Sequence, residues 1–261
     1  MTDKDFLWLN LRELPYFRAM LRAVEAQFFQ AYEFPSPTLD VGCGDGHFAT
    51  VAFNRPIDVG LDPWAGPIHQ AARYGGYHAL VQADGGRIPF PSGYFASTFS
   101  NSVLEHIPHV QAVLADLRRV LKPGALFLFC VPNPRYLSEL SVPGILGRLG
   151  LKRLGQAYTG WFKRMSRVEH LAWPEEWQSW LGAAGFTLEK WWHYFSPQAM
   201  RILEWGHYFG APTLLPHVIS RKWLIAPYRW NLSITEKLIR RHALAEPDPN
   251  GTFTFYVARS A

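Results

Sequence analysis

Cysteine is scarce in this sequence, and its scarcity limits the available chemistry. The 261 residues include two cysteines, Cys43 in a glycine-rich turn and Cys130 in an apolar run. Two such isolated residues indicate neither a disulfide framework nor a thiolate metal site. We therefore expect no bound metal and a reducing, cytoplasmic location.

Long apolar runs are also missing. No stretch reaches the roughly 18 apolar residues of a membrane-spanning helix. The first ten residues, MTDKDFLWLN, carry charges where a secretory signal needs an apolar core. We expect a protein without a membrane span, either soluble or peripheral at the membrane.

The net charge of +5 is unevenly distributed. Residues 135–170 and 196–245 each contain seven Lys or Arg and two Asp or Glu, whereas the rest has 12 basic and 17 acidic residues. Both segments are also too apolar for disordered linkers. We expect a single domain over residues 1–261, in which 1–36 is an N-terminal helical cover over the nucleotide site. The two basic, aromatic segments are expected to be helical insertions.

Short apolar runs alternate with helical patterns along the chain. Apolar residues from Phe17 to Phe28 recur at helical spacing and predict an amphipathic helix. A helical stripe from Val110 to Leu121 stops at Lys122-Pro123-Gly124, and another helix is expected from Pro174 to Gly185. Strands are expected at 38–42, 57–62, 79–84, 94–100, 125–131, from Phe186 and, antiparallel, at 253–257. This alternation predicts an α/β fold with a parallel sheet.

A glycine-rich turn follows the first expected strand. In LDVGCGDGHFA, Gly42, Gly44 and Gly46 let the backbone approach a ligand closely and aim helix N-terminal amides at it. Asp62 ends the second strand, where a carboxylate can accept hydrogen bonds from two ribose hydroxyls. The same residues satisfy the looser dinucleotide pattern, so they indicate a nucleotide-type cofactor without deciding which one.

Residues further along distinguish between the cofactors. Ala83-Asp84-Gly85 ends the third strand, Ile88-Pro89-Phe90 follows, and SNSVLEHI comes after the fourth. Together with LDVGCGDG, these residues resemble class I methyltransferases, in particular the small-molecule branch typified by ubiquinone and menaquinone biosynthesis enzymes. The resemblance covers residues 38–132 and, more loosely, 183–192. It implies a Rossmann-like sheet of seven mostly parallel strands, the last antiparallel, with helices on both faces and helical insertions.

The resemblance also assigns residues to a cofactor, S-adenosyl-L-methionine. The three glycines would contact its methionine and ribose parts, with Asp40 beneath the methionine. Asp62 would bind the ribose, and Asp84, beside Gly85, the adenine amino group. Asn101 closes the fourth strand, where it would contact cofactor or acceptor or cap the turn.

Charge favours the same cofactor. Asp40, Asp45, Asp62 and Asp84 surround the expected site, and S-adenosylmethionine is cationic at sulfur and nitrogen whereas dinucleotides are anionic. Asp45 has the alternative of capping the following helix. An NAD-dependent oxidoreductase and a non-catalytic module that binds an adenosyl cofactor remain the alternatives to a methyltransferase.

Three side chains are candidates for proton transfer. His106, with Glu105 beside it, and His170 resemble family positions that border the methyl-transfer chamber and shape the acceptor pocket; a structural role is the alternative for each. Methyl transfer is an in-line displacement at a sulfonium. Alignment of the two reactants and exclusion of water therefore account for most of the catalysis. A phenol or alcohol acceptor requires a base, whereas a carbon or amine acceptor requires none.

The basic insertions bear on the acceptor. The first mixes Trp161 with basic residues, and the second has a basic set that includes Arg221 and Lys222. Such stretches suit a membrane interface, so we expect a small-molecule or lipid-like acceptor near an anionic membrane surface. The alternative is that these aromatics form ordinary helix core. Nucleic acid ranks lower, because Ser100-Asn101-Ser102-Val103 departs from the Asn/Asp-Pro-Pro-aromatic stretch of amino-methylating enzymes, and no obligate protein partner is indicated.

Overall fold

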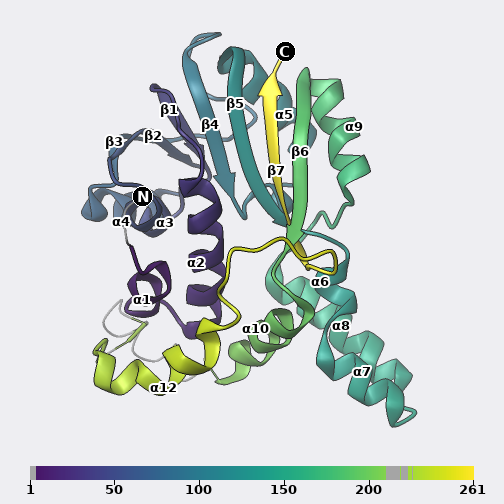
Figure 1. The fold of residues 1–261 in the computed structure, drawn as a ribbon. Coiled ribbons are helices and arrows are strands. Elements are labelled where there is room, and N and C mark those ends of the chain that lie inside the picture. The colour runs from purple at the N-terminus through teal and green to yellow at the C-terminus, as the bar shows by residue number, and fades with distance from the viewer. Residues whose placement is uncertain (1–3, 210–217, 219–222, 225) are drawn as a thin grey trace. The chain divides into compact units, whose positions relative to one another are not determined.

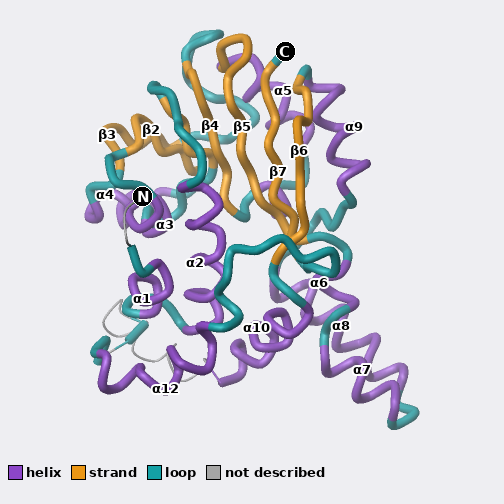
Figure 2. Tube along the Cα trace, in the orientation of Figure 1, coloured by secondary structure: helices purple, strands orange, loops and turns teal. Residues whose placement is uncertain are grey.

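Strands and helices alternate along most of the chain (Figures 1 and 2). The computed structural model describes residues 4–209, 218, 223–224 and 226–261. The strands are β1 (Thr38–Val41), β2 (Ile57–Asp62), β3 (Tyr77–Gln82), β4 (Phe95–Asn101), β5 (Leu121–Pro132), β6 (Phe186–Tyr194) and β7 (Phe253–Ser260). The helices before β5 are α1 (Phe6–Leu11), α2 (Tyr16–Gln30), α3 (His47–Ala52), α4 (Ala65–Tyr74), the 3-10 helix η1 (Leu104–His106) and α5 (Val110–Val120). Those after it are α6 (Arg135–Ser138), α7 (Ser141–Arg148), α8 (Lys152–Ser166), α9 (Pro174–Ala184), α10 (Pro197–Phe209) and α12 (Arg229–Arg240).

The strands of the described residues form one seven-stranded sheet. Its order is β3-β2-β1-β4-β5-β7-β6, in which β1 to β5 run parallel and β7 is antiparallel to β5. The predicted parallel sheet with an antiparallel last strand is confirmed. The chain adds β2 and β3 on one side of β1 and β4 and β5 on the other. The switch point between β1 and β4 is where open α/β sheets bind ligands, outside the carboxyl ends of the strands.

Two strands begin two or more residues earlier than the sequence predicts. β3 begins at Tyr77 instead of residue 79, because Tyr77 already pairs with Ile57 of β2. β5 begins at Leu121, so the predicted stop at 122–124 is the irregular first part of a strand. Gly124 there has φ +73°, a left-handed conformation that favours glycine.

Helices α5 and α9 cover one face of the sheet (Figure 1). The predicted apolar stripe of α5 is buried, and so are Trp177 and Leu181 of α9. Pro174 is the first residue of α9, and Gly185 ends the helix with φ +87°, as the sequence predicts. Both helices share a core with strand residues such as Phe127.

An aromatic cluster covers the opposite face. Phe29 packs edge to face against Phe99 of β4 and Phe255 of β7, with ring centroids 5.5 and 5.1 Å apart. Phe48 of α3 joins the cluster at 5.4 Å from Phe29. Phe255 and its neighbour Tyr256, which lies in the core under α5 and α9, alternate across the sheet. Helices therefore lie on both faces.

The chain divides into two compact units. Unit 1 comprises Met1–Phe28, Arg135–Arg167 and Tyr194–Thr252, and unit 2 comprises Phe29–Pro134, Val168–His193 and Phe253–Ala261. Unit 2 holds nearly all of the sheet with α3, α4, η1, α5 and α9, and unit 1 holds the other described helices. The expected organisation as one domain with a helical cover and two insertions stays a prediction.

Within unit 1, Glu204 ties α10 to the first turn of α7. Its buried carboxylate accepts hydrogen bonds from the amide and the hydroxyl of Ser141, both at 2.6 Å, and from the amide of Val142 at 3.2 Å. The first amides of a helix have no partner inside the helix, and its dipole favours a negative charge there. Tyr208 adds a second tie, because its hydroxyl donates to that of Tyr158 on α8 at 2.6 Å.

His207 lies in an aromatic core that α2, α8 and α10 share. Its ring centroid is 4.4 Å from that of Phe17 and 5.4 Å from that of Phe162. Burial lowers the pKa of His207, and its Nδ1 lies 2.9 Å from the carbonyl oxygen of Leu203. Next to it, a Cβ on Gly206 would stand 2.4 Å from Phe17, so α2 and α10 touch at this glycine.

Neither a membrane-spanning helix nor a metal-binding cluster occurs in the described part of the chain. Its helices are all too short or too polar to cross a bilayer. Its His, Cys, Asp and Glu side chains form no group of three or more suited to hold a metal ion. Arg221 and Lys222 of the second basic segment lie outside the described residues.

Candidate active site

The glycine turn after β1 has one open position. Gly42, Gly44 and Gly46 all have positive φ, at +81°, +55° and +79°. A Cβ on Gly42 would stand 2.4 Å from Val103, and one on Gly46 would stand 2.9 Å from Ala71. A Cβ on Gly44 would meet none of the described residues within 4 Å. Gly42 and Gly46 therefore serve close packing, and Gly44 leaves the backbone accessible to a ligand.

Asp62 connects the end of β2 to this turn. Its Oδ2 accepts a hydrogen bond from the Gly44 amide at 3.0 Å, and its Oδ1 accepts one from the Trp64 amide at 2.9 Å. Its carbonyl oxygen accepts from the amide of Ala83 at 3.1 Å, which joins the ends of β2 and β3. A carboxylate has about four acceptor positions, so the two backbone bonds leave capacity for ligand hydroxyls.

Asp40 lies within β1, where it is buried and bonded to a residue that the sequence analysis missed. The hydroxyl of Tyr77 donates to Asp40 Oδ2 at 2.6 Å. The tyrosine side chain passes close to Gly60 of β2, where a Cβ would stand 2.8 Å from the ring. The contact between Tyr77 and Asp40 spans two strand spacings and 37 positions of sequence. No local sequence pattern therefore reveals it.

Asp84 and Asp45 each bond to their own turn. Asp84 is exposed, and its Oδ1 accepts from the amide two residues further on at 2.7 Å. Asp45 Oδ1 accepts from the amide of His47, the first residue of α3, at 3.1 Å. Asp45 therefore bonds to the first amide of α3 from just outside the helix, whereas the N-cap position itself is held by Gly46. Gly85 lies against α5, where a Cβ would stand 3.2 Å from Val113.

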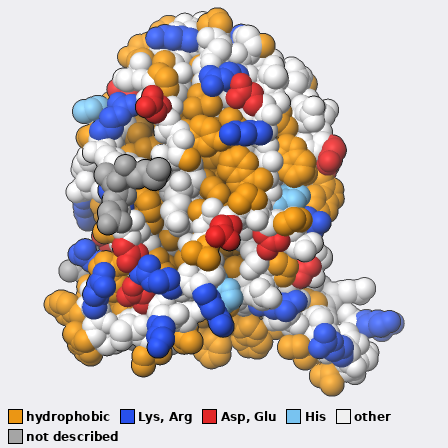
Figure 3. Space-filling model, viewed as in Figure 1, with side chains coloured by type: hydrophobic (Ala, Val, Ile, Leu, Met, Phe, Trp, Pro, Cys, Tyr) orange, Lys and Arg blue, Asp and Glu red, His pale blue; other side chains and the backbone are white. Residues whose placement is uncertain are grey.

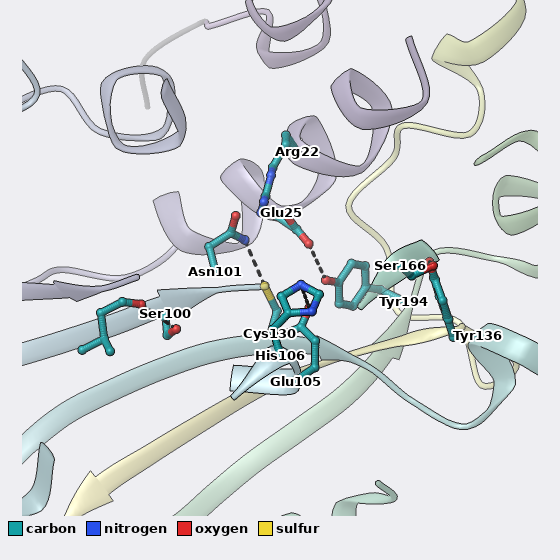
Figure 4. A network of polar contacts seen from close by, with 11 residues as sticks. Arg22, Glu25, Ser100, Asn101, Glu105, His106, Cys130, Tyr136, Ser166 and Tyr194 are labelled. Atoms are coloured by element: carbon teal, nitrogen blue, oxygen red, sulfur yellow. Dashed lines mark hydrogen bonds and ion pairs between the residues drawn. The ribbon is translucent and has the colours of Figure 1, made fainter. Parts of the chain in front are cut away.

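Asn101 stands at the end of β4, at the switch point of the sheet. It is buried, and its Nδ2 donates to the Sγ of Cys130 on β5 at 3.0 Å (Figure 4). Ser102 follows with φ +51° and donates its amide to the Cys130 carbonyl oxygen at 3.0 Å. The chain thus turns sharply toward Val103, the residue that lies against Gly42.

The three candidates for proton transfer meet around η1. Glu105 is buried, and its Oε1 lies 3.7 Å from Nε2 of His106, whose side chain is 40% exposed (Figure 4). The carbonyl oxygen of Glu105 accepts from the amides of Glu169 and His170 at 2.9 and 3.0 Å. The His170 ring is anchored as well, with Nε2 at 2.9 Å from the carbonyl oxygen of Ile107. That bond requires a proton on Nε2, so His170 holds the turn in place.

The raised pKa values of two side chains reflect the negative charge around the glycine turn. Burial raises the pKa of the Cys43 thiol, and Asp40 and Asp62 raise it further. Burial also raises the pKa of Tyr77, with Asp40 as the next cause. Both groups keep their protons at neutral pH, and the same field favours a cation and disfavours an anion beside the turn.

Trp64 is a second residue at the turn that the sequence analysis missed. Its side chain is 71% exposed, while its amide is held by Asp62. An exposed indole beside a carboxylate suited to ribose offers a face on which a purine can stack. In the sequence, the feature that could have identified Trp64 as a site residue is its position two residues after Asp62.

Comparison with known proteins decides between the cofactors that the turn could hold. Residues 39–129 match the family model described as a methyltransferase domain. This segment is a class I methyltransferase domain. The cofactor of such domains is S-adenosylmethionine. The methyltransferase domain includes the glycine turn, Asp62, Asp84 and η1.

Curated relatives of the methyltransferase domain share about a third of its residues. Malonyl-[acyl-carrier protein] O-methyltransferase of Legionella pneumophila is 30% identical over 112 residues, which are 41% of this chain and 39% of that protein. A sterol 24-C-methyltransferase of Gibberella zeae is 34% identical over 97 residues, 34% of this chain and 26% of that protein. The matched region thus spans well under half the length of these relatives.

The fold extends the likeness beyond the methyltransferase domain. Geranyl diphosphate C-methyltransferase from Streptomyces coelicolor, solved with Mg²⁺, geranyl-S-thiolodiphosphate and S-adenosylhomocysteine, superposes with a TM-score of 0.55. The superposition covers 95% of this chain and 81% of that one. At 15% sequence identity the likeness shows a common fold and nothing finer.

Proposed function

We propose that this chain transfers the methyl group of S-adenosylmethionine to an apolar or lipid-linked small molecule at an anionic membrane surface. The observation that carries the transferase part is the glycine turn, which is open at Gly44 and flanked by the carboxylates of Asp40 and Asp62. The pyrophosphate of NAD would meet the same carboxylates, which argues against an oxidoreductase. The intact glycines and acids argue against a non-catalytic binding module.

Residues at the carboxyl ends of β1 to β4 would hold the cofactor. The ammonium and sulfonium of its methionine part suit Asp40, and its ribose hydroxyls suit the remaining acceptor positions of Asp62. Adenine would lie beside Trp64 and Asp84. The full set proposed to bind it is Asp40, Gly42, Gly44, Gly46, Asp62, Trp64, Asp84, Gly85 and Asn101.

When bound, the cofactor would supply a methyl group on a positively charged sulfur for in-line displacement by the acceptor. The residues of the chain align the two reactants within about 3 to 3.5 Å and exclude water. The cofactor is cationic at sulfur and its demethylated product is neutral there, so carboxylates that bind the cation would strengthen binding more than they would accelerate transfer. Asp40 and Asp62 would therefore act mainly on cofactor affinity.

His106 is the best placed of the three candidates for removing a proton from a hydroxyl acceptor. Its side chain is exposed, whereas the Glu105 carboxylate is buried beside it and would stabilise the protonated imidazole. His170 is anchored through Nε2 to Ile107 and would position the turn. We assign the base to His106, with Glu105 as its partner.

The names of similar proteins support an acceptor with a large apolar part. A sterol and geranyl diphosphate are such molecules, and malonyl-[acyl-carrier protein] is a carrier-linked acid. The sequence motifs also resemble the small-molecule branch typified by ubiquinone and menaquinone biosynthesis enzymes. Membership of that branch stays a prediction.

Helix α12 supports the membrane part of the proposal, because it has two apolar faces. Leu232 and Ile239 are buried on one face. Trp230, Ile234 and Leu238 are 76, 75 and 61% exposed on the other. Their spacing of four residues places these three side chains in line along the helix. Packing inside the protein accounts for the apolar residues of the first face. The apolar residues of the second face are exposed, and we propose that a membrane surface covers them.

Helix α8 repeats the pattern in the same unit. Its Leu154, Trp161 and Met165 are exposed. Over the helices of unit 1, Figure 3 shows hydrophobic side chains next to Lys and Arg. Tryptophan suits the interface of a bilayer and basic side chains suit its phosphates, so an anionic lipid surface complements both helices. The exposed basic residues of α8, of α12 and of the position after α12 are Lys152, Arg153, Lys163, Arg164, Arg229, Lys237, Arg240 and Arg241.

Thermal unfolding with three ligands tests the transferase part. S-adenosylhomocysteine and S-adenosylmethionine should raise the unfolding midpoint progressively with concentration, whereas NAD should not. A rise with NAD alone would identify an oxidoreductase. No rise with any of the three would contradict cofactor binding altogether.

A further inference from the structure

A tyrosine from β3 reaches an aspartate on β1 across the strand between them. The Tyr77 hydroxyl lies 2.6 Å from Asp40 Oδ2. Hydrogen bonds from a hydroxyl to an ionised carboxylate are typically this short, at 2.5 to 2.7 Å. Both residues belong to unit 2, and both are held by strands of its sheet.

Two glycines leave room for the tyrosine ring. A Cβ on Gly60 would stand 2.8 Å from two ring carbons of Tyr77. A Cβ on Gly46 would stand 3.3 Å from a third ring carbon. Any larger residue at Gly60 would displace the ring, and with it the hydroxyl that reaches Asp40. The ring therefore lies between the middle strand and the glycine turn.

We propose that Tyr77 is a positioning residue that holds the Asp40 carboxylate in the orientation in which it faces the ammonium group of the cofactor. This inference rests on the proposed function, which places the methionine part of S-adenosylmethionine above Asp40. Tyr77, which lies outside the glycine motif, would thus contribute to recognition of the methionine part of the cofactor.

The chemistry of the pair fits this role. Burial and the neighbouring Asp40 raise the pKa of Tyr77, so its hydroxyl remains a donor throughout the physiological pH range. A carboxylate that accepts this bond has its plane fixed before the ligand arrives. Preorganised groups bind more tightly because less freedom is lost on binding.

Replacing Tyr77 by Phe removes the hydroxyl and keeps the ring that the two glycines enclose. Binding of two ligands by calorimetry then separates positioning from structure. S-adenosylhomocysteine carries the ammonium group, whereas 5′-methylthioadenosine shares its adenosine and thioether but lacks the amino acid. Tyr77→Phe should weaken S-adenosylhomocysteine about tenfold, the low end for a lost bond to a charged group, and change methylthioadenosine less than about twofold.

Two further variants complete the test. Tyr94→Phe removes the hydroxyl of an exposed tyrosine in the same unit and should change neither affinity. Asp40→Asn should lose the same ligand selectivity, and adding Tyr77→Phe to it should cause little further loss, because the two residues act as one unit. If Tyr77→Phe does not fold, Asp40→Asn still tests the inference, because Tyr77 cannot act through Asp40 if that variant keeps the ligand selectivity.

The outcomes separate this inference from the proposed function. Equal losses for both ligands, or no loss for either, would overturn the role of Tyr77 while leaving the transferase proposal intact. Unaltered selectivity in Asp40→Asn would overturn it as well. If the unaltered protein binds neither ligand, both proposals fail together.

Discussion

The Asp62 carboxylate holds the amide of Gly44 at 3.0 Å, so the acid at the end of β2 fixes the open position of the glycine turn. The same carboxylate binds the amide of Trp64. One side chain thus orders both segments of backbone that border the expected ribose. Its substitution affects the shape of the site as well as its charge.

Replacing Asp62 by Ala should weaken adenosyl-cofactor binding by about 1.5 to 3 kcal/mol, the usual loss for hydrogen bonds to a charged group. Calorimetric titration with S-adenosylhomocysteine measures the change. Glu189→Ala is the matched control, because it removes a carboxylate from an exposed ion pair with Arg259. An unchanged dissociation constant for Asp62→Ala would contradict the proposed placement.

Alanine at Gly42 should mainly lower the stability of the fold, whereas alanine at Gly44 should mainly lower cofactor affinity. Both substitutions force a left-handed conformation at a cost of about 1 to 2 kcal/mol. Gly42→Ala also drives a Cβ into Val103 and should lower the unfolding midpoint more than Gly44→Ala. Gly44→Ala should cause the larger loss of cofactor affinity for a folded protein. Equal unfolding midpoints would show that Gly42 is not required for packing.

Removing the Glu204 side chain should destabilise unit 1. Glu204→Ala leaves the amides of Ser141 and Val142 in the first turn of α7 without their acceptor, at a cost of about 1.5 to 3 kcal/mol. Urea unfolding measures the loss. Glu139→Ala, which breaks an exposed pair with Arg201, should cost at most about 1 kcal/mol. Similar losses for the two variants would argue against the cap.

Acidification should destabilise the folded chain through His207. Its pKa is lowered in the fold, so the unfolded chain takes up a proton first as the pH falls below the ordinary value of 6.5. The stability from the neutral imidazole is complete above that pH and is lost as the pH falls toward the lower pKa of the folded state. Urea unfolding of the native chain and of His207→Gln between neutral and mildly acidic pH should give a shallower pH dependence for the variant. Identical slopes would assign the effect to other groups.

Replacing the exposed stripe of α12 by serine, at Trp230, Ile234 and Leu238, should strongly reduce binding to anionic vesicles. Co-sedimentation with equimolar phosphatidylserine and phosphatidylcholine measures it, with pure phosphatidylcholine as the neutral comparison. The variant lacks three apolar side chains that would enter the bilayer, so the bound fraction should fall about tenfold or more. Tyr74→Ser with Tyr94→Ser provides exposed aromatic controls in unit 2. Binding of the native chain that is insensitive to anionic lipid would refute the membrane proposal.

Local patterns were sufficient to predict the sheet and the glycine turn. The stripe of α5 and the alternation of strands depend on residues within a few positions of one another, and so does the turn that contains Gly42, Gly44 and Gly46. The start of β3 differs from the prediction, because it depends on pairing between Tyr77 and Ile57 of another strand.

The contacts that order the site could not be predicted in this way. Tyr77 lies 37 positions from Asp40, and His170 lies 63 positions from the carbonyl of Ile107. Separations of 37 and 63 residues match no helix or strand period, so the sequence does not indicate that these residues are in contact. A tyrosine at the start of a strand is also common, so Tyr77 does not stand out. The bond between Tyr77 and Asp40 depends on strand order, and the bond between His170 and Ile107 depends on the packing of two loops, so both become known only when the fold is assembled.

The position of β7 between β5 and β6 sets an order of events during synthesis. Once β5 has left the ribosome, its outer side stays unpaired until residues 253–260 have been translated. About 120 residues separate the two strands, and at 5 to 20 residues per second the nascent chain carries that exposed backbone for roughly 6 to 24 seconds. An unpaired strand recruits other chains, so chaperone protection should matter most during this interval.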